Sequence, residues 1–222
     1  MNRILALDTT NEYGSLALAG DGQVVAEVLL HSQEGFSGIL FDQLRGLLER
    51  GGWRLEDIDC FAAAAGPGSF TGVRVGLAAV KGLAEALGKR VVAVSNLEAV
   101  AWFGGAALRA AVVDARRGQI YGAVYTAELG IASPEVVMPF PAWLATLPEG
   151  GVEFVCQDFA PFRPALEGTR FEHSMVREAP RALAGAIAKI AAARLAAGLS
   201  RSPAEIDANY VRQSDAELFW SE

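Results

Sequence analysis

The segment with the most residues able to bind or react with a ligand runs from Gly66 to Gly76 and reads GPGSFTGVRVG. Glycines that lead into a helix are typical of loops that bind phosphate groups. The spacing fits neither common template, because Thr71 stands where the P-loop and the dinucleotide-binding motif each need a glycine. A serine nucleophile elbow is excluded as well, since Pro67 and Thr71 flank Ser69 where that motif has glycines. The segment therefore predicts a helix start without a recognisable catalytic motif.

The cysteines and histidines offer little further chemistry. Cys60 and Cys156 lie far apart in apolar, strand-like segments without CxxC spacing, which favours buried reduced thiols over a disulfide or a metal site. The two histidines, His31 and His173, do not form the i, i+4 pair that places two imidazoles on one helix face. We expect both to be surface or hydrogen-bonded residues, and we predict no metal site.

The elements of the first half follow from hydrophobic spacing. Period-two or uniformly apolar segments predict strands at 3–7, 15–19, 23–30, 58–65 and 91–94, the first three forming a meander. Helical spacing predicts one helix over 36–48, with Phe36, Leu40 and Leu44 on its apolar face, and a second that ends near Leu87 before Gly88. Phe41 falls off the apolar face of the first helix, so we expect it to be exposed and able to serve as an interface anchor.

In the second half the opening pattern recurs. Apolar residues end at Asp114 as they do at Asp8, 106 residues earlier, and in both places a polar turn and another strand-like segment follow. This predicts an internal duplication, although strand-Asp-turn-strand is common enough to arise by chance. Gly104-Gly105 marks the expected boundary, which gives lobes at 1–104 and 105–202. The second lobe then includes an alanine-rich helix over 180–197, and 203–222 form a tail that packs back on the lobes.

The second helix of the first lobe is unusual for its small residues. Gly72 and Gly76 are four residues apart, and Ala78, Gly82 and Ala86 form a second row with the same spacing. Each interior glycine costs a helix about 1 kcal/mol relative to alanine, so close approach of a neighbouring backbone is the expected reason. The neighbour is either a strand of the same chain or a helix of a partner, and the sequence supports both equally.

Composition narrows the class of protein. The chain has 222 residues, of which 52% are hydrophobic and 20% charged, and this is enough to build sizeable cores. The sequence shows no membrane span and no signal peptide, so we expect a cytoplasmic protein. The formal net charge of −7 disfavours direct binding to a phosphate backbone, so we expect a partner to hold most of any RNA that is involved.

Several motifs together resemble one family. Residues 65–84 read AGPGSFTGVRVGLAAVKGLA and resemble the signature of the TsaB (YeaZ) family of tRNA threonylcarbamoyladenosine biosynthesis proteins, which is related to the TsaD/Kae1 family. Ile4-Leu5-Ala6-Leu7-Asp8-Thr9-Thr10, the segment from Asp114 to Tyr121, and Tyr210-Val211-Arg212 resemble further family segments in the same order. The resemblance spans nearly the whole chain and is weak over 133–177.

The resemblance implies an α/β protein with the actin-like, Hsp70-like fold of two duplicated lobes. It also implies a non-catalytic subunit that activates a TsaD-like transferase, together with a TsaE-like ATPase, and that forms a homodimer when isolated. By this resemblance the two helices of the first lobe meet TsaD or a second copy, and a bulky residue at Gly76 would abolish pairing without unfolding the monomer. The expected partner-binding residues are Phe36, Leu40, Phe41, Phe70, Gly72, Val73, Gly76 and Ala79.

In actin-like ATPases, turns such as those after the first strand of each lobe hold phosphates and a divalent metal. The candidate nucleotide-binding residues are therefore Asp8, Thr9, Thr10, Asp114 and Arg116. A self-contained turn around Asp8 and a solvated turn or surface ion pair at Arg116 are the alternatives. We expect no intrinsic cofactor, and ATP or ADP with Mg²⁺ only in the partner complex. The competing hypothesis is an independent nucleotide hydrolase or peptidase of the actin-like superfamily.

Overall fold

The chain forms two units and passes between them three times. The computed structural model describes residues 2–212. Unit 1 contains residues 2–99 and Pro180–Ala208, and unit 2 contains Val100–Ala179 with residues 209–212. These boundaries differ from the predicted lobes of 1–104 and 105–202, and the predicted tail begins inside unit 1. Residues 213–222 of that tail lie outside the described part of the chain.

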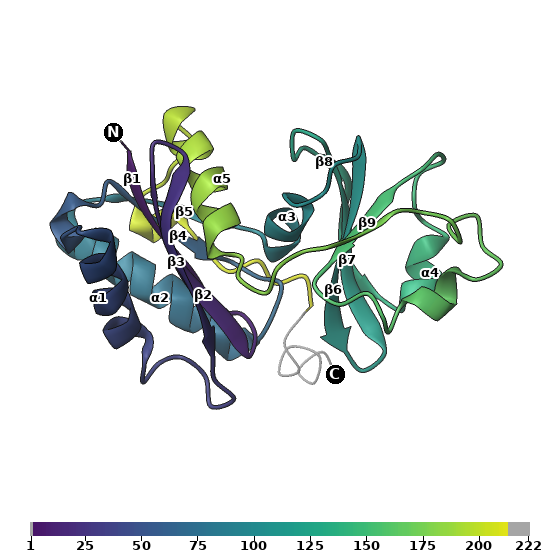
Figure 1. The fold of residues 1–222 in the computed structure, drawn as a ribbon, viewed down its shortest axis with the longest axis horizontal. Helices are drawn as coiled ribbons and strands as arrows, with labels where there is room; N and C mark the ends of the chain where they lie inside the picture. The colour runs from purple at the N-terminus through teal and green to yellow at the C-terminus, as the bar shows by residue number, and fades with distance from the viewer. Residues whose placement is uncertain (1, 213–222) are drawn as a thin grey trace, which may run out of the picture. The chain divides into compact units, whose positions relative to one another are not determined.

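Unit 1 is built on a five-stranded sheet in the order β3-β2-β1-β4-β5 (Figure 1). The strands are β1 (Arg3–Asp8), β2 (Tyr13–Gly20), β3 (Gln23–His31), β4 (Cys60–Ala64) and β5 (Arg90–Val94). The first three form the predicted antiparallel meander, and β4 and β5 run parallel to β1. Asp21 and Gly22 both have positive φ, as a two-residue hairpin turn requires.

Helices cover both faces of this sheet. α1 (Leu40–Gly51) and α2 (Phe70–Leu87) lie on one side, and α5 (Ala184–Ala196) lies on the other (Figure 1). Because side chains alternate along a strand, Leu5 and Leu7 join the core beneath α1 and α2, while Ile4 and Ala6 are buried outside that core. The short helices η1 (Leu55–Asp57), α3 (Asn96–Ala101) and η3 (Pro203–Glu205) complete the unit, with α3 continuing into unit 2.

Helix α5 belongs to unit 1, which corrects its predicted place in the second lobe. It packs on all five strands of the first sheet, and its N-terminal N–H groups are held by that sheet. Ser15 Oγ accepts hydrogen bonds from the N–H groups of Leu183 and Ala184 at 3.0 and 2.9 Å, and Glu27 accepts one from Gly185 at 2.7 Å. The alanine-rich pattern predicts the helix but does not show which sheet buries it.

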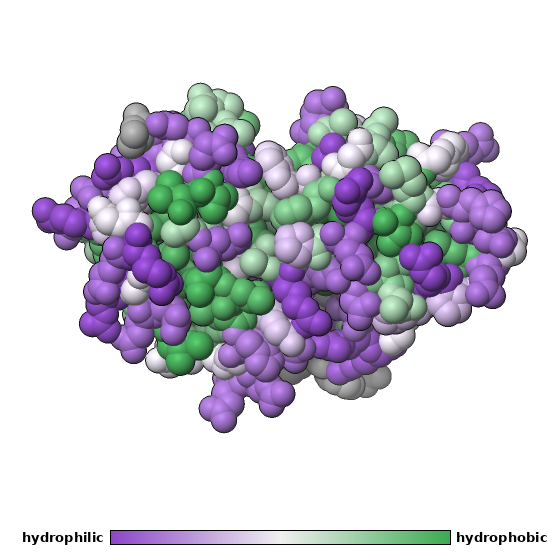
Figure 2. Space-filling model, in the orientation of Figure 1, coloured by the Kyte–Doolittle hydropathy of each residue, from purple (hydrophilic) through white to green (hydrophobic). Residues whose placement is uncertain are grey.

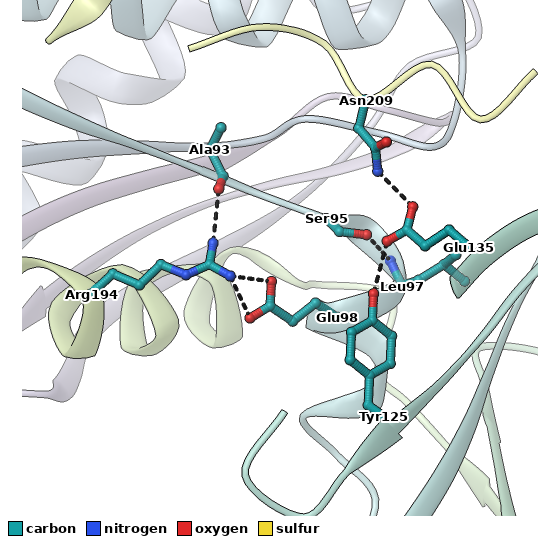
Figure 3. Close-up of polar contacts among 8 residues, drawn as sticks. All are labelled: Ala93, Ser95, Leu97, Glu98, Tyr125, Glu135, Arg194 and Asn209. Carbon is teal, nitrogen blue, oxygen red and sulfur yellow. Dashed lines mark hydrogen bonds and ion pairs between the residues drawn. The ribbon is translucent and has the colours of Figure 1, made fainter. Parts of the chain in front are cut away.

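An ion pair fixes α5 near its other end (Figure 3). Arg194 donates to both carboxylate oxygens of Glu98 on α3, at 2.8 and 2.7 Å, and to the carbonyl of Ala93 at 2.9 Å. Glu98 is nearly buried and Arg194 is about one third exposed, so the pair is only partly screened by water. The pair ties α3, α5 and the end of β5 together within unit 1.

Unit 2 repeats the sheet of unit 1. Its strands are β6 (Leu108–Arg116), β7 (Gln119–Thr126), β8 (Ile131–Met138), β9 (Glu153–Cys156) and β10 (Val176–Glu178), in the order β10-β9-β6-β7-β8. Each strand has the neighbours and directions of its counterpart five strands earlier. The predicted duplication is therefore confirmed, and the architecture is the actin-like fold of two related α/β lobes.

The helical parts of unit 2 are short. α4 (Phe140–Leu144) follows β8, and only the single turn η2 (Arg163–Leu166) lies between β9 and β10, where unit 1 has the long helix α2. Aromatic residues fill the core instead, and the rings of Phe140 and Phe154 contact each other and those of Trp143 and Phe159. No helix within residues 2–212 is long and apolar enough to cross a membrane.

The described end of the chain is attached to unit 2, as the predicted tail packing requires. Asn209 donates to Glu135 on β8 at 2.6 Å, and Glu135 also accepts a hydrogen bond from the hydroxyl of Tyr125 at 2.8 Å (Figure 3). Arg212 donates to the carbonyl of Ala115 and to Gln119 at 3.0 and 2.6 Å. Residues 209–212 therefore hold both β8 and the turn between β6 and β7.

Candidate functional site

The turn after β1 is closed by hydrogen bonds within unit 1. Oδ1 of Asp8 accepts hydrogen bonds from the N–H and the hydroxyl of Thr10, at 2.9 and 2.6 Å. Thr9 donates its hydroxyl to the carbonyl of Gly72 on α2 at 2.7 Å, and Ser69 donates its N–H to the carbonyl of Thr10 at 2.6 Å. This is the self-contained turn considered above, with the start of α2 packed against it.

The glycines of the GPGSFTG segment make this close packing possible. A Cβ on Gly68 would lie 2.7 Å from the carbonyl oxygen of Thr10, and one on Gly72 would lie 2.1 Å from that of Thr9. A Cβ on Gly76 would lie 2.6 Å from Oγ1 of Thr9. Gly68, Gly72 and Gly76 therefore form one row, spaced by four residues, that faces the chain's own loop. The structure therefore places this row against the chain itself, at the turn after β1 and, for Gly76, also at Leu7 of strand β1, and not against a partner helix.

Asn96 links the same turn to the segment before α2. Its amide nitrogen donates to Oγ1 of Thr10 at 2.7 Å, and its amide oxygen accepts a hydrogen bond from the N–H of Gly66 at 3.0 Å. The N–H of Asn96 also donates to the carbonyl of Gly66, which precedes a cis bond to Pro67. Asn96 did not emerge from the sequence. Its position directly after a buried strand, at the start of a helix, was the available signal.

Asp8 carries an unsatisfied oxygen at the centre of this network. Its side chain is fully buried, and Oδ2 has no hydrogen-bond partner among the described residues. Burial raises the pKa of Asp8 above its ordinary value, and the hydrogen bonds from Thr10 and the influence of Asn96 offset this rise only in part. A buried carboxylate oxygen without a hydrogen-bond partner is rare and destabilising. Asp8 therefore stands out among the buried polar side chains of unit 1.

The corresponding turn of unit 2 has the same hydrogen bond but is open to solvent. Oδ1 of Asp114 accepts a hydrogen bond from the N–H of Arg116 at 2.8 Å, as Oδ1 of Asp8 does from Thr10. Asp114 and Arg116 also form an ion pair at 3.5 Å with both side chains more than half exposed, which is one of the alternatives given above. Unit 2 has only η2 where α2 covers the turn of unit 1, which explains the difference.

Among the candidate nucleotide-binding residues, Asp8, Thr9 and Thr10 are buried, and Asp114 and Arg116 are exposed. The first three are occupied by contacts with one another and with α2. A phosphate could reach them only if the start of α2 moved away, because Gly72 is already in contact with the backbone of Thr9. In this conformation the side chains of Asp8, Thr9 and Thr10 are not open to a nucleotide. Nucleotide binding by these three residues, and by Asp114 and Arg116, stays a prediction.

Most of the candidate partner-binding residues are also internal. Phe36, Leu40, Val73 and Ala79 belong to the core of unit 1. Gly76 is buried and Gly72 half-buried against the Thr9 turn. The described conformation therefore places these six residues against the sheet and the turn after β1 of unit 1, and their contact with a partner stays a prediction.

The outward side of α1 and α2 retains the remaining two candidates. Phe41 on α1 is 56% exposed and Phe70 at the start of α2 is 42% exposed, beneath the guanidinium of Arg74 at 3.6 Å. Further along α2 the exposed side is the second small-residue row of Ala78, Gly82 and Ala86. A Cβ on Gly82 would meet no described atom within 4 Å. We call these exposed residues the α1–α2 face.

The cysteines are inert in this structure. Burial raises the pKa of the Cys60 thiol to about 12 and that of Cys156 to about 11, so both stay protonated near neutral pH. The described residues contain no group of three or more His, Cys, Asp or Glu side chains placed to hold a metal ion.

Comparison with known proteins agrees with this fold. The family model described as TsaD, tRNA N6-adenosine threonylcarbamoyltransferase, matches residues 30–202. The TsaB proteins of Escherichia coli and Bacillus subtilis, named as tRNA threonylcarbamoyladenosine biosynthesis proteins, are 41% and 34% identical to the chain over 127 and 153 residues. The chain belongs to the TsaD family and is of the TsaB (YeaZ) type. The resemblance identified from the sequence is thereby confirmed.

The extent of these matches differs between sequence and structure. The two alignments cover 55% and 66% of this chain and 54% and 66% of the relatives, so the chain spans about half to two thirds of the curated relatives it matches. The structure of YeaZ from Pseudomonas aeruginosa superposes with a TM-score of 0.81 at 27% identity. It covers 95% of this chain and 100% of the YeaZ chain, so the TsaB-type fold extends over both units.

Proposed function

We propose that the chain is a non-catalytic subunit that binds and activates a TsaD-like transferase, which forms threonylcarbamoyladenosine at the adenosine beside the tRNA anticodon. The names of the TsaB relatives support a role in this biosynthesis. The observation that carries the subunit role is the α1–α2 face, where Phe41 is more than half exposed on a helix whose opposite side is fully packed. Exposed aromatic side chains of this kind are common anchors of protein interfaces.

The small residues beside Phe70 make the same face suitable for helix packing. Ala78, Gly82 and Ala86 lie one turn apart on the outward side of α2, so another helix can approach its backbone closely. The Gly72 row is used internally, and the Gly82 row has no such neighbour among the described residues. The proposed partner contact therefore moves from Gly72 and Gly76 to the opposite side of the same helix.

The closed turn after β1 supports a non-catalytic role. In an actin-like ATPase this turn is required to hold a phosphate, and here Thr9 and Thr10 are hydrogen-bonded to α2 instead. We therefore place ATP or ADP and Mg²⁺ only in the partner complex.

The wider assembly is part of the proposal. By the family resemblance, a TsaE-like ATPase joins the complex, tRNA is contacted only through it, and the isolated chain pairs with a second copy through the α1–α2 face. The net charge of −7 agrees with leaving most of the tRNA phosphate contacts to the partners. The chain would act in the cytoplasm, where its partners encounter tRNA.

The proposal is tested by binding of the TsaD-like protein from the same organism to the purified chain. Gly82→Arg and Phe41→Asp should each weaken the complex at least tenfold, because one introduces bulk and the other a charge at the centre of the face. Leu199→Asp, an equally exposed apolar residue of unit 1 outside the face, is the matched control and should bind normally. Unchanged affinity in both face variants, measured by isothermal titration calorimetry, would show that the contact lies elsewhere.

One observation favours a second candidate, an independent actin-like nucleotide hydrolase. The unpartnered Oδ2 of Asp8 lies where such enzymes place an acidic group, and an outward movement of α2 would uncover it. Titration of the chain alone with ATP and Mg²⁺, with Asp8→Asn as control, distinguishes the two candidates. Turnover that is lost in Asp8→Asn would favour the hydrolase over the subunit role.

A further inference from the structure

The four edge strands of the two sheets differ in how well they are protected. The edge of β5 is covered by Arg201, whose N–H and carbonyl both bond to Val91 at 2.9 Å. β8 is interrupted by Pro134, and β10 has only three residues. Short strands, prolines and covering segments are the usual means by which proteins block unwanted strand pairing at an edge.

Strand β3 is neither short, interrupted by proline nor covered by another described segment, although its pairing with β2 has one irregularity, at Val25. It runs for nine residues without proline or lysine, and β2 is its only backbone hydrogen-bond partner within residues 2–212. One row of its N–H and C=O groups therefore remains available along the outer edge of the first sheet. A row of this kind bonds to an extended backbone and cannot be satisfied by a helix.

The side chains of β3 provide apolar contacts on both faces of the sheet. On the side of α5 lie Glu27, which accepts a hydrogen bond from Gly185, and Leu29, which is 48% exposed and pairs with Ser15. Val25, at the irregularity in the pairing with β2, is 51% exposed. On the other side, Ala26 and Val28 are partly buried against the core beneath α1 and α2. In Figure 2, hydrophobic residues gather over the part of unit 1 where Figure 1 labels β2 and β3. An added strand would therefore extend the apolar surface on each of the two faces of the sheet.

Charge on β3 argues against a second copy as the occupant. In a symmetric antiparallel pair, the register that sets Val25 opposite Leu29 of the other copy also sets the two Glu27 side chains opposite each other. Like charges directly opposite across strands are destabilising. The charge of Lys189 and the N–H of Gly185 already stabilise the Glu27 carboxylate. A bound segment therefore needs no basic residue opposite Glu27, but it must not place an acidic residue there.

We propose that β3 accepts an extended segment of a partner protein as a sixth strand of the first sheet. The segment has apolar residues opposite Val25 and Leu29 and a basic or neutral residue opposite Glu27, which gives the alternating pattern apolar, any, basic or neutral, any, apolar. Backbone hydrogen bonds supply the attachment and the alternate side chains supply the selectivity. This inference does not depend on the proposed function, because it uses the edge of the sheet and not the α1–α2 face.

The experiment uses the whole chain, immobilised, and a displayed library of random nine-residue peptides. The enriched peptides should show the alternating pattern without an acidic central residue, and a synthetic copy should protect amides of β3 from hydrogen exchange. Leu29→Lys, which places a charge at an exposed position of the edge, should weaken this peptide at least tenfold. Ile131→Lys makes the same change at an exposed position of β8, the edge that contains Pro134, and should have no effect.

Three results would overturn the proposal. Enriched peptides without the pattern, equal binding to the wild type and Leu29→Lys, or protection that falls outside β3 would each show that the edge does not select a strand. A dimer of the free chain that dissociates in Leu29→Lys, detected by light scattering, would assign the edge to a second copy instead. A dimer lost only in Gly82→Arg belongs to the α1–α2 face and leaves this inference intact.

Discussion

Alanine substitution at two glycines of α2 should change the stability of the chain in opposite directions. At Gly82 a Cβ meets no described atom within 4 Å, so Gly82→Ala should stabilise the helix by about 1 kcal/mol, the usual difference between the two residues. At Gly76 the same Cβ would lie 2.6 Å from Oγ1 of Thr9 and 3.0 Å from Cδ1 of Leu7. Ordinary contacts between such atoms are about 3.5 Å or longer, so Thr9 has to move.

The size of the effect at Gly76 follows from what that movement breaks. Thr9 donates its hydroxyl to the carbonyl of Gly72, and losing this hydrogen bond costs about 1 kcal/mol. Overpacking of a well-packed region costs about 1–3 kcal/mol, against which the alanine returns about 1 kcal/mol of helix propensity. Gly76→Ala should therefore be less stable than the wild type by about 1–3 kcal/mol and less stable than Gly82→Ala by about 2–4 kcal/mol, although the chemical change is identical.

Urea unfolding followed by far-ultraviolet circular dichroism measures this difference, with the wild type as reference. At about 2–4 °C per kcal/mol for a chain of this size, thermal unfolding should separate the two variants by several degrees. If Gly76→Ala equals Gly82→Ala in stability, the Thr9 turn does not pack on α2 as described. The first glycine row would then be available to a partner, and the original prediction for a bulky residue at Gly76 would stand.

Three further predictions concern buried polar groups and thiols. Because burial raises the pKa of Asp8 in the folded state, the stability of the wild type relative to Asp8→Asn should fall as pH rises above the unfolded pKa of about 3.8; urea titrations at pH 4, 6 and 8 test this, and a constant difference would refute it. Replacing Arg194 with methionine removes the bidentate partner of Glu98 and should lower the free energy of unfolding by about 1–3 kcal/mol in the same assay; no loss would show that the pair is screened by water. Cys60 and Cys156 should react with Ellman's reagent at pH 8 only after unfolding, and rapid reaction of the native chain would contradict their burial.

The sequence predicted the elements of unit 1 well because each has a local cause. The Gly20-Asp21-Gly22 turn fixes the β2–β3 hairpin, and Gly88 ends α2 in the left-handed conformation expected of a helix C-cap. The duplication was visible because Asp8 and Asp114 each close a turn with the N–H two residues later. Such bonds depend only on neighbouring residues, so their signal survives in the sequence.

The sequence could not show which of two chemically equivalent neighbours a helix packs against. Alanine-rich α5 could pack on either sheet, and it packs on the first, where Ser15 and Glu27 accept hydrogen bonds from its N-terminal N–H groups. For α2, two rows of small residues lie on different sides, and both permit close approach. The row that contains Gly76 faces the Thr9 turn, which is distant in sequence, so no local pattern could separate it from the row that contains Gly82.

The two Asp turns show how the same local motif acquires different roles in the two units. In unit 1 an 18-residue helix follows β4, and its glycine row covers the turn and buries Asp8 completely. In unit 2 a four-residue turn follows β9, and Asp114 stays exposed beside Arg116. The difference therefore arises from the segment after the fourth strand of each sheet, and not from the turn itself. On the proposed function, the helix that seals the phosphate-type turn of unit 1 on one side binds a partner protein with its other side, where Phe70 and Gly82 are exposed.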